Sequence, residues 1–321
     1  MSFSTFKVDS LTAPVTNAGQ PMVSSPFSFF LAAVPGTGYR LYILTNVVDT
    51  LFQATIRSPF NAPTRKANQP GTTSTVDSSD GNILASPYYD GTSIWFTHVI
   101  DVLGFPTVRY GAINLTNNGK VVDAAVAFHS ATSDDFNPSL AVGLNPSGTS
   151  VYLNWAFTDA PAGTATSAVV DTLPAGQPIA NLIGTGAVYA VGSTTTQTRF
   201  GDFSSVAIDS QVPDGTCAVA AQQYFSDDGT WKTRLARVGT CPPPVLVVLV
   251  PVVRNDDLAE AGQVLAAAGL TVGQVTDVLD PVCNHIGTVL FQHPNPGTTV
   301  AGGSAVSLSI GRQPPPPFEC P

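Results

Sequence analysis

Six residues of this 321-residue chain combine side chains that could bind and transform a polar ligand. Arginines bind carboxylates through two parallel hydrogen bonds, and a tyrosine beside a carboxylate can serve as a nucleophile. The candidate residues are Arg40, Arg109, Arg199, Asp202, Tyr88 and Tyr110, which could form a site only if the fold brought them to one central channel. Their spacing does not force them to converge, so anchoring hydrogen bonds and ring stacking are the competing interpretation.

Metal-binding patterns are weak in this sequence. The four histidines, His98, His129, His285 and His293, form neither an HxH nor an HxxxH pair, so we expect structural histidines and no metal site. The acidic segments 77–82 and 133–137 carry oxygen ligands suited to Ca²⁺ but lack the twelve-residue EF-hand spacing. We therefore predict no cofactor, with Ca²⁺ as a minor alternative, and turn chemistry for both segments.

The cysteines indicate disulfides. Cys217, Cys241, Cys283 and Cys320 contain no CxxC pair, which argues against a zinc ribbon. Local pairing, Cys217 with Cys241 and Cys283 with Cys320, suits their positions, although four cysteines allow three connectivities and unpaired thiols stay open. Disulfides would place the protein in an oxidising compartment.

Composition excludes several classes of protein. Acidic residues outnumber basic ones by 22 − 13 = 9, so the chain lacks the basic patch that nucleic-acid binding needs. The apolar run at 245–250 is far shorter than the ~20 residues of a membrane span. Only 11% of residues are charged, which predicts a surface of hydroxyls and amides.

The start, MSFSTFKVDS, has neither the basic region nor the apolar core of a signal peptide. Either Met1 opens a mature or truncated form, or the protein leaves the cell without a signal peptide, as virion proteins do on lysis. We predict an extracellular, cell-surface or virion location.

Residues 25–241 show the regularly spaced turn signals of an all-β chain. Asp-Gly or Asn-Gly pairs at 80–81, 90–91, 118–119, 214–215 and 228–229 are strong hairpin signals between runs rich in aromatic and β-branched residues. Four segments, about 29–60, 83–130, 137–175 and 199–240, each have the size of a propeller blade. A sandwich of several sheets is the alternative.

Residues from about 40 to 240 also resemble bacterial sialidase-like β-propeller proteins. The stretch RFGDFSS at 199–205 is similar to an R-W-G-D-Y-S block of that group, and SDDGTW at 226–231 is similar to its Asp-box hairpin. The resemblance implies about six blades, whereas four are recognisable. The ring is therefore small, or a partner chain completes it, or strands are missing at its N-terminal side, where the segment 1–24 could supply a closing strand. A working sialidase would need the six candidate residues in one channel, and the R-I-P motif of the family is absent.

The only strong helix pattern lies at 256–269, after the prolines of a 242–248 linker. Asp257 and Glu260 have the spacing of a capping box, and Gly269 suits the left-handed position after the helix. Two or three strands follow, in the stretches 270–279, 287–294 and 304–311. With VPVV at 250–253 and NPGT at 295–298, this order resembles a PASTA domain over 249–311, followed by a proline-rich tail at 312–321. The resemblance implies an association with peptidoglycan fragments or a spacer role.

The predicted protein is thus mainly β, with a β-propeller-like N-terminal domain of about four recognisable blades and a small α+β PASTA-like domain. We expect a non-catalytic surface protein that binds or presents glycan or protein partners. The alternatives are a structural subunit of a virion, fibre or surface filament, with self-association, and a sialidase-like glycoside hydrolase.

Overall fold

A computed structural model describes residues 13–14, 16–17, 27–45, 50–78, 81–116, 121–197, 200, 204–212, 214–243 and 246–316. The chain forms two compact units, residues 1–241 and 242–321, which we call the body and the C-terminal unit. Each has its own hydrophobic core.

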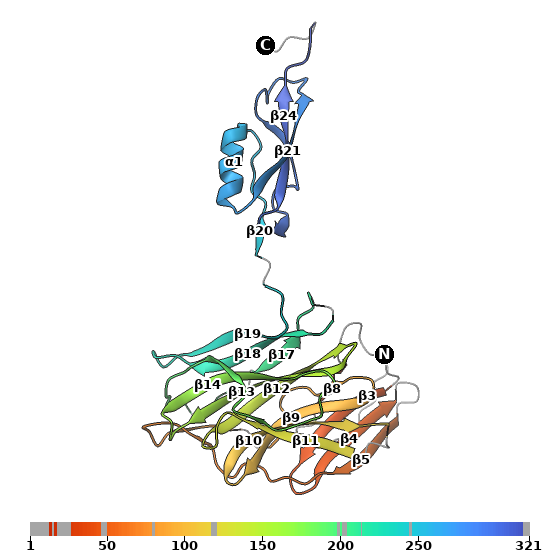
Figure 1. The fold of residues 1–321 in the computed structure, drawn as a ribbon, viewed down its shortest axis with the longest axis vertical. Helices are drawn as coiled ribbons and strands as arrows, with labels where there is room; N and C mark the ends of the chain where they lie inside the picture. The colour runs from red at the N-terminus through yellow and green to blue at the C-terminus, as the bar shows by residue number, and fades with distance from the viewer. Residues whose placement is uncertain are drawn as a thin grey trace. The chain divides into compact units, whose positions relative to one another are not determined.

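The body consists mainly of four sheets in chain order (Figure 1). The first sheet contains β1 (Ala13–Pro14), β3 (Phe27–Val34), β4 (Gly38–Thr45) and β5 (Thr50–Arg57). The second has the order β15 (Leu182–Ile183), β11 (Val121–Phe128), β10 (Phe105–Asn114), β9 (Ser93–Val102), β8 (Tyr88–Tyr89) and β2 (Thr16–Asn17). The third contains β12 (Asp134–Asn145), β13 (Gly148–Asp159), β14 (Thr164–Leu173) and β16 (Ala187–Ala190). The fourth contains β17 (Ser205–Ile208), β18 (Cys217–Phe225) and β19 (Trp231–Gly239), and β6 (Ala67–Asn68) pairs with β7 (Thr75–Val76).

Each sheet packs on the next one along the chain. Leu31 and Tyr39 of the first sheet share a core with Phe96 of the second. Another core joins the second sheet to the third, and a smaller one joins the third to the fourth. The cores form because alternate side chains along a strand point to the same face of its sheet. The central strands β12 and β13 of the third sheet are buried on both faces, since this sheet packs against two neighbours.

The prediction of a mainly β fold is confirmed, but the sheets of the described residues do not close into a propeller. The four segments do correspond to the four sheets, so turn spacing located the units correctly. Closure would require the last sheet to pack against the first. Instead, Trp231 and Leu235 on β19 of the fourth sheet are 60% and 67% exposed, and this edge of the stack is open.

Three predicted hairpins share one local structure. Asp90, Asp214 and Asp228 each lead into Gly-Thr, and each carboxylate accepts hydrogen bonds from the amide and the hydroxyl of that threonine. The intervening glycines have φ between 67° and 100°, which favours glycine. These turns connect β8 to β9, β17 to β18 and β18 to β19. Asp80 and the pair 118–119 lie outside the described residues.

The N-terminal segment contributes two short pairings. Ala13–Pro14 pairs with β3, and Thr16–Asn17 pairs in parallel with β8. The remainder of 1–24, where a closing strand was predicted, is outside the described residues.

The described part of the C-terminal unit packs helix α1 (Leu258–Ala267) against one face of a small sheet. That sheet has the order β21 (Thr271–Leu279), β24 (Ala305–Arg312) and β22 (Val289–His293), and β20 (Val247–Leu249) pairs with β23 (Thr299–Ala301). The predicted capping box is present: Asp257 Oδ1 accepts from the Glu260 amide at 2.8 Å. Gly269 has the expected left-handed φ of 71°.

Of the two predicted disulfides, Cys217–Cys241 is present and ties the start of β18 to the end of the body. The pairing of Cys283 with Cys320 stays a prediction, because Cys320 lies outside the described residues.

Candidate functional site

The structure does not bring the described members of the predicted channel cluster together. Arg109 on β10 donates to Ser58 Oγ at 2.6 Å and lies over the Tyr39 ring, 5.7 Å from its centroid. Tyr110, the next residue, faces the third sheet, and its hydroxyl donates to the Ala180 carbonyl. Arg40 follows Tyr39 on β4 and therefore points to the opposite face of the first sheet.

Tyr88 packs against the cores shared by the second, third and fourth sheets, and its hydroxyl donates to the Val206 carbonyl at 3.4 Å. Arg199 and Asp202 lie outside the described residues. The observed hydrogen bonds of Arg109, Tyr110 and Tyr88 thus anchor the second sheet to neighbouring segments of the body.

A buried histidine lies beside Arg109. His98 Nδ1 faces the Gly81 carbonyl at 3.1 Å, so this nitrogen carries the proton and Nε2 accepts from the Tyr39 hydroxyl at 2.9 Å. Burial and the nearby Arg109 charge lower the pKa of His98 to about 3. A neutral imidazole with both nitrogens engaged joins the first two sheets and is not available as a metal ligand.

The acidic segment 133–137 is held by the protein's own donors. Asp134 pairs with both terminal guanidinium nitrogens of Arg65, at 2.5 and 2.8 Å. Asp135 is fully buried and accepts from Ser133 Oγ at 2.6 Å and from Trp155 Nε1 at 2.8 Å. Desolvation raises the pKa of Asp135 to about 7. Within the described ranges, no three His, Cys, Asp or Glu residues are grouped to hold a metal ion.

The C-terminal unit presents a polar sheet face with an exposed aromatic ring. On the central strand β24, Val306, Leu308 and Ile310 point into the helix-covered core, so Ser307 and Ser309 point outward. Register places Phe291 beside Ser309 and His293 beside Ser307 on β22. On the other side, Thr276 of β21 lies opposite Ser309, with 3.3 Å between their hydroxyl oxygens.

These side chains, with Gln274, line a shallow hollow of about 170 Å³. We call it the outer face of the C-terminal unit. Phe291 is 58% exposed there, whereas an aromatic side chain of this size would normally be buried. Gln292 points the other way, accepting from the Val253 amide at 2.9 Å and donating to the Pro251 carbonyl at 2.8 Å. These two hydrogen bonds tie β22 to the segment 251–253 and hold Phe291, the neighbour of Gln292, in position.

A comparison with protein families agrees with this geometry. The model of the PASTA domain family matches residues 248–312. Residues 248–312 are a PASTA domain. The PASTA domain is a module associated with peptidoglycan or related ligands and with cell-envelope proteins.

No curated protein matches the chain. The resemblance of the body to sialidase-like propellers gains no support from these comparisons. In the part of the chain that the structure describes, no helix is long and apolar enough to cross a membrane.

The outer face was missed in the sequence, although a signal was present. The alternation Val-Ser-Leu-Ser-Ile at 306–310 indicates a strand with one apolar and one hydroxyl-bearing face. An aromatic residue on the neighbouring strand, at Phe291, was the further hint.

Proposed function

We propose that this protein is a non-catalytic extracellular or surface protein that attaches to peptidoglycan through the outer face of its PASTA domain. The observation that carries the proposal is Phe291, an exposed ring set among hydroxyl and amide side chains. The body is then the part that is presented, and it binds glycan or protein partners. The Cys217–Cys241 disulfide supports an oxidising compartment.

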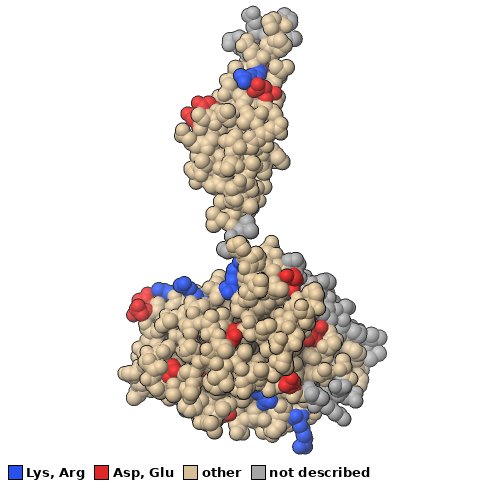
Figure 2. Space-filling model, viewed as in Figure 1, with Lys and Arg blue, Asp and Glu red and all other residues tan. Residues whose placement is uncertain are grey.

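The chemistry of the outer face suits a glycan strand. An aromatic ring contributes a large apolar contact with little loss of conformational freedom, and the C–H face of a sugar ring can pack on it. Ser307, Ser309 and Gln274 can exchange hydrogen bonds with hydroxyl and acetamido groups. None of the described residues lining the hollow is Asp, Glu, Lys or Arg, and Figure 2 shows few charged side chains on the face of the molecule in view.

Co-sedimentation of the intact chain with purified sacculi tests the proposal. Replacing Phe291 by alanine removes the exposed ring, and we expect the affinity for sacculi to fall by about tenfold. Phe52→Ala is the matched control, because Phe52 is 55% exposed but belongs to the body. Equal binding by the parent and the Phe291→Ala variant would exclude the outer face as the wall-binding site.

A second function is favoured by the exposed apolar side chains on β19 of the fourth sheet. The exposed Trp231 and Leu235 suit a subunit contact, as expected for a structural subunit of a virion or surface filament. Light scattering over a range of concentrations tests this function. A monomer at every concentration, for both the parent and a Trp231→Ala, Leu235→Ala double variant, would reject it.

A further inference from the structure

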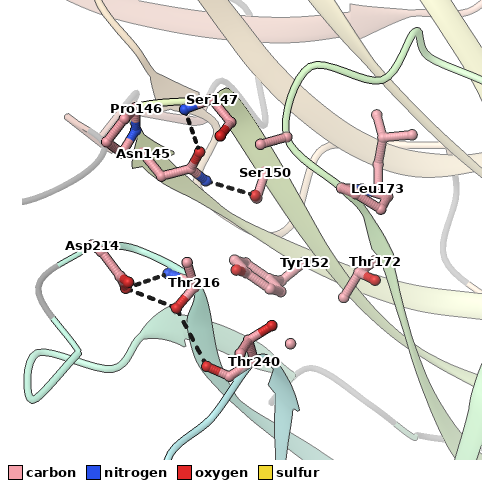
Figure 3. A pocket seen from close by; sticks show the side chains of 13 residues that line it. Asn145, Pro146, Ser147, Ser150, Tyr152, Thr172, Leu173, Asp214, Thr216 and Thr240 are labelled. Carbon is pink, nitrogen blue, oxygen red and sulfur yellow. Dashed lines mark hydrogen bonds between the residues drawn. The ribbon is translucent and has the colours of Figure 1, made fainter.

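A polar pocket in the body is independent of the PASTA domain. It has a volume of about 450 Å³ and opens where the third and fourth sheets meet at their ends (Figure 3). Four segments form it: the β12–β13 turn, the end of β14, the β17–β18 turn and the end of β19. The volume lies within the ordinary range of small-molecule pockets, about 300–1,000 Å³.

The walls are held in place by contacts between these segments. Tyr152 forms the floor, and its hydroxyl donates to the Gly215 carbonyl at 2.8 Å. The Thr240 amide donates to the Thr216 carbonyl at 2.8 Å, next to the Cys217–Cys241 disulfide. A ligand would therefore meet a preformed pocket, and binding would cost little ordering of the protein.

One wall consists of hydrogen-bonding groups. Asp214 accepts from the Thr216 hydroxyl at 2.7 Å and from its amide at 3.1 Å, and these bonds hold the pKa of Asp214 below its usual value. Its carboxylate is ionised at neutral pH and retains lone pairs for further donors. Across the pocket, Asn145 Nδ2 donates to Ser150 Oγ at 3.0 Å, with the side chain of Ser147 beside them, and Thr172 lies next to Tyr152 (Figure 3).

The other wall is apolar. Pro146, Pro174 and Ala175 supply carbon surface beside the polar groups, whereas the side chain of Leu173 is buried in the core between the second and third sheets. None of the described residues that line the pocket is lysine or arginine, so nothing there would pair with a phosphate or a sugar carboxylate. The lining thus matches a ligand that has hydroxyl groups along its rim and a C–H face, and that carries no negative charge.

We propose that this pocket binds a neutral saccharide unit. Sugar hydroxyls donate to the Asp214 carboxylate and exchange hydrogen bonds with Thr172 and Asn145, while the C–H face of the ring packs on the exposed Pro174. The site is separate from the outer face of the PASTA domain and does not depend on it. It would give the body its own glycan specificity.

Saturation-transfer NMR and calorimetry on the intact chain test this inference, with N,N′-diacetylchitobiose and maltose as neutral probes and N-acetylneuraminic acid as the charged probe. Ser147→Trp fills the mouth of the pocket from a hairpin turn where the backbone amide of Ser147, and not its side chain, bonds to Asn145. Thr172→Val removes one hydroxyl with almost no change of shape on a β-strand. Phe291→Ala is the control that separates this site from the PASTA domain.

We expect a neutral probe to bind the parent and the Phe291→Ala chain. Thr172→Val should weaken that binding by about fivefold, the value of one hydrogen bond. In the Phe291→Ala chain, Ser147→Trp should abolish it, and the charged probe should give no signal. The inference is overturned if neither neutral probe binds the parent, if binding is unchanged in Thr172→Val and Ser147→Trp, or if Phe291→Ala removes it. Should Ser147→Trp fail to fold, Thr172→Val alone decides.

Discussion

Replacing Asp135 by asparagine should remove a strong pH dependence from the stability of the body. Asp135 is fully buried, and its carboxylate accepts from Ser133 Oγ, Trp155 Nε1 and the His129 amide. Asparagine is nearly isosteric and keeps a carbonyl oxygen for the two N–H donors. Its amide can donate to Ser133 Oγ, so the network survives without a charge.

The magnitude follows from the difference between the two pKa values of this carboxyl group. Desolvation raises the pKa of Asp135 from 3.8 to about 7 on folding. Each pH unit between these values is worth about 1.4 kcal/mol, so ionising the buried group costs up to about 4 kcal/mol of folding free energy. The stabilising contribution of the protonated Asp135 carboxyl is complete below the pKa of the unfolded state and is lost as the pH rises through the pKa of the folded state.

Urea unfolding followed by tryptophan fluorescence measures this effect selectively. The three tryptophans, Trp95, Trp155 and Trp231, all lie in the body, so the PASTA domain does not contribute to the signal. We expect the free energy of unfolding of Asp135→Asn, minus that of the parent, to rise by up to about 4 kcal/mol between about pH 4 and about pH 8. The low pKa of His98 acts in the opposite direction, but it is common to both proteins and cancels in the difference.

Asp123→Asn is the matched control, because Asp123 is an exposed carboxylate on β11 of the body. Its difference from the parent should stay constant over the same pH range. A constant difference for Asp135→Asn as well would refute the reasoning. It would mean that the three hydrogen bonds to the carboxylate compensate fully for its loss of hydration.

Two further substitutions separate the body from the PASTA domain. Cys217→Ser opens a disulfide with a sequence separation of 24. The unfolded body then gains the conformational entropy that the cross-link had removed, which should lower its free energy of unfolding by about 3 kcal/mol. Urea unfolding followed by tryptophan fluorescence measures this change. An equal fall in the stability of the parent under reducing conditions would confirm that the disulfide is the cause. An unchanged urea midpoint for Cys217→Ser would contradict the prediction. Leu265→Ala removes a fully buried side chain between α1 and its sheet and should cost about 2–5 kcal/mol. Its effect should appear as a lower melting temperature of a calorimetric transition that leaves the tryptophan signal unchanged, and a shift of the tryptophan transition would show that the two units do not unfold independently.

Local chemistry made several elements predictable from the sequence alone. The capping box of Asp257 and Glu260, the left-handed Gly269 and the Asp-Gly-Thr turns each involve groups within four residues of one another. Their geometry depends on neighbouring backbone atoms and hardly on the rest of the fold. Because these signals occur in order and at regular spacing, they also located the four β segments and the PASTA domain.

The arrangement of these elements depended on contacts between residues far apart in the chain. Arg109 and Tyr110 are adjacent in sequence, yet the pleat of β10 sends them into different cores, which separates members of the predicted cluster. Whether four sheets form a ring or an open stack is decided by how their apolar faces pack. The turns specify pairing within a sheet and carry no information about that packing.

The two proposed binding sites also depend on contacts between residues far apart in the chain. Ser309 and Phe291 become neighbours only through the register of β24 and β22, and the body pocket joins four segments that span residues 145 to 240. The residue types were visible in the sequence, but their distances were not. Tertiary packing alone determined which hydroxyls, amides and rings face a common space, because burying the apolar side of each strand leaves the opposite side outward.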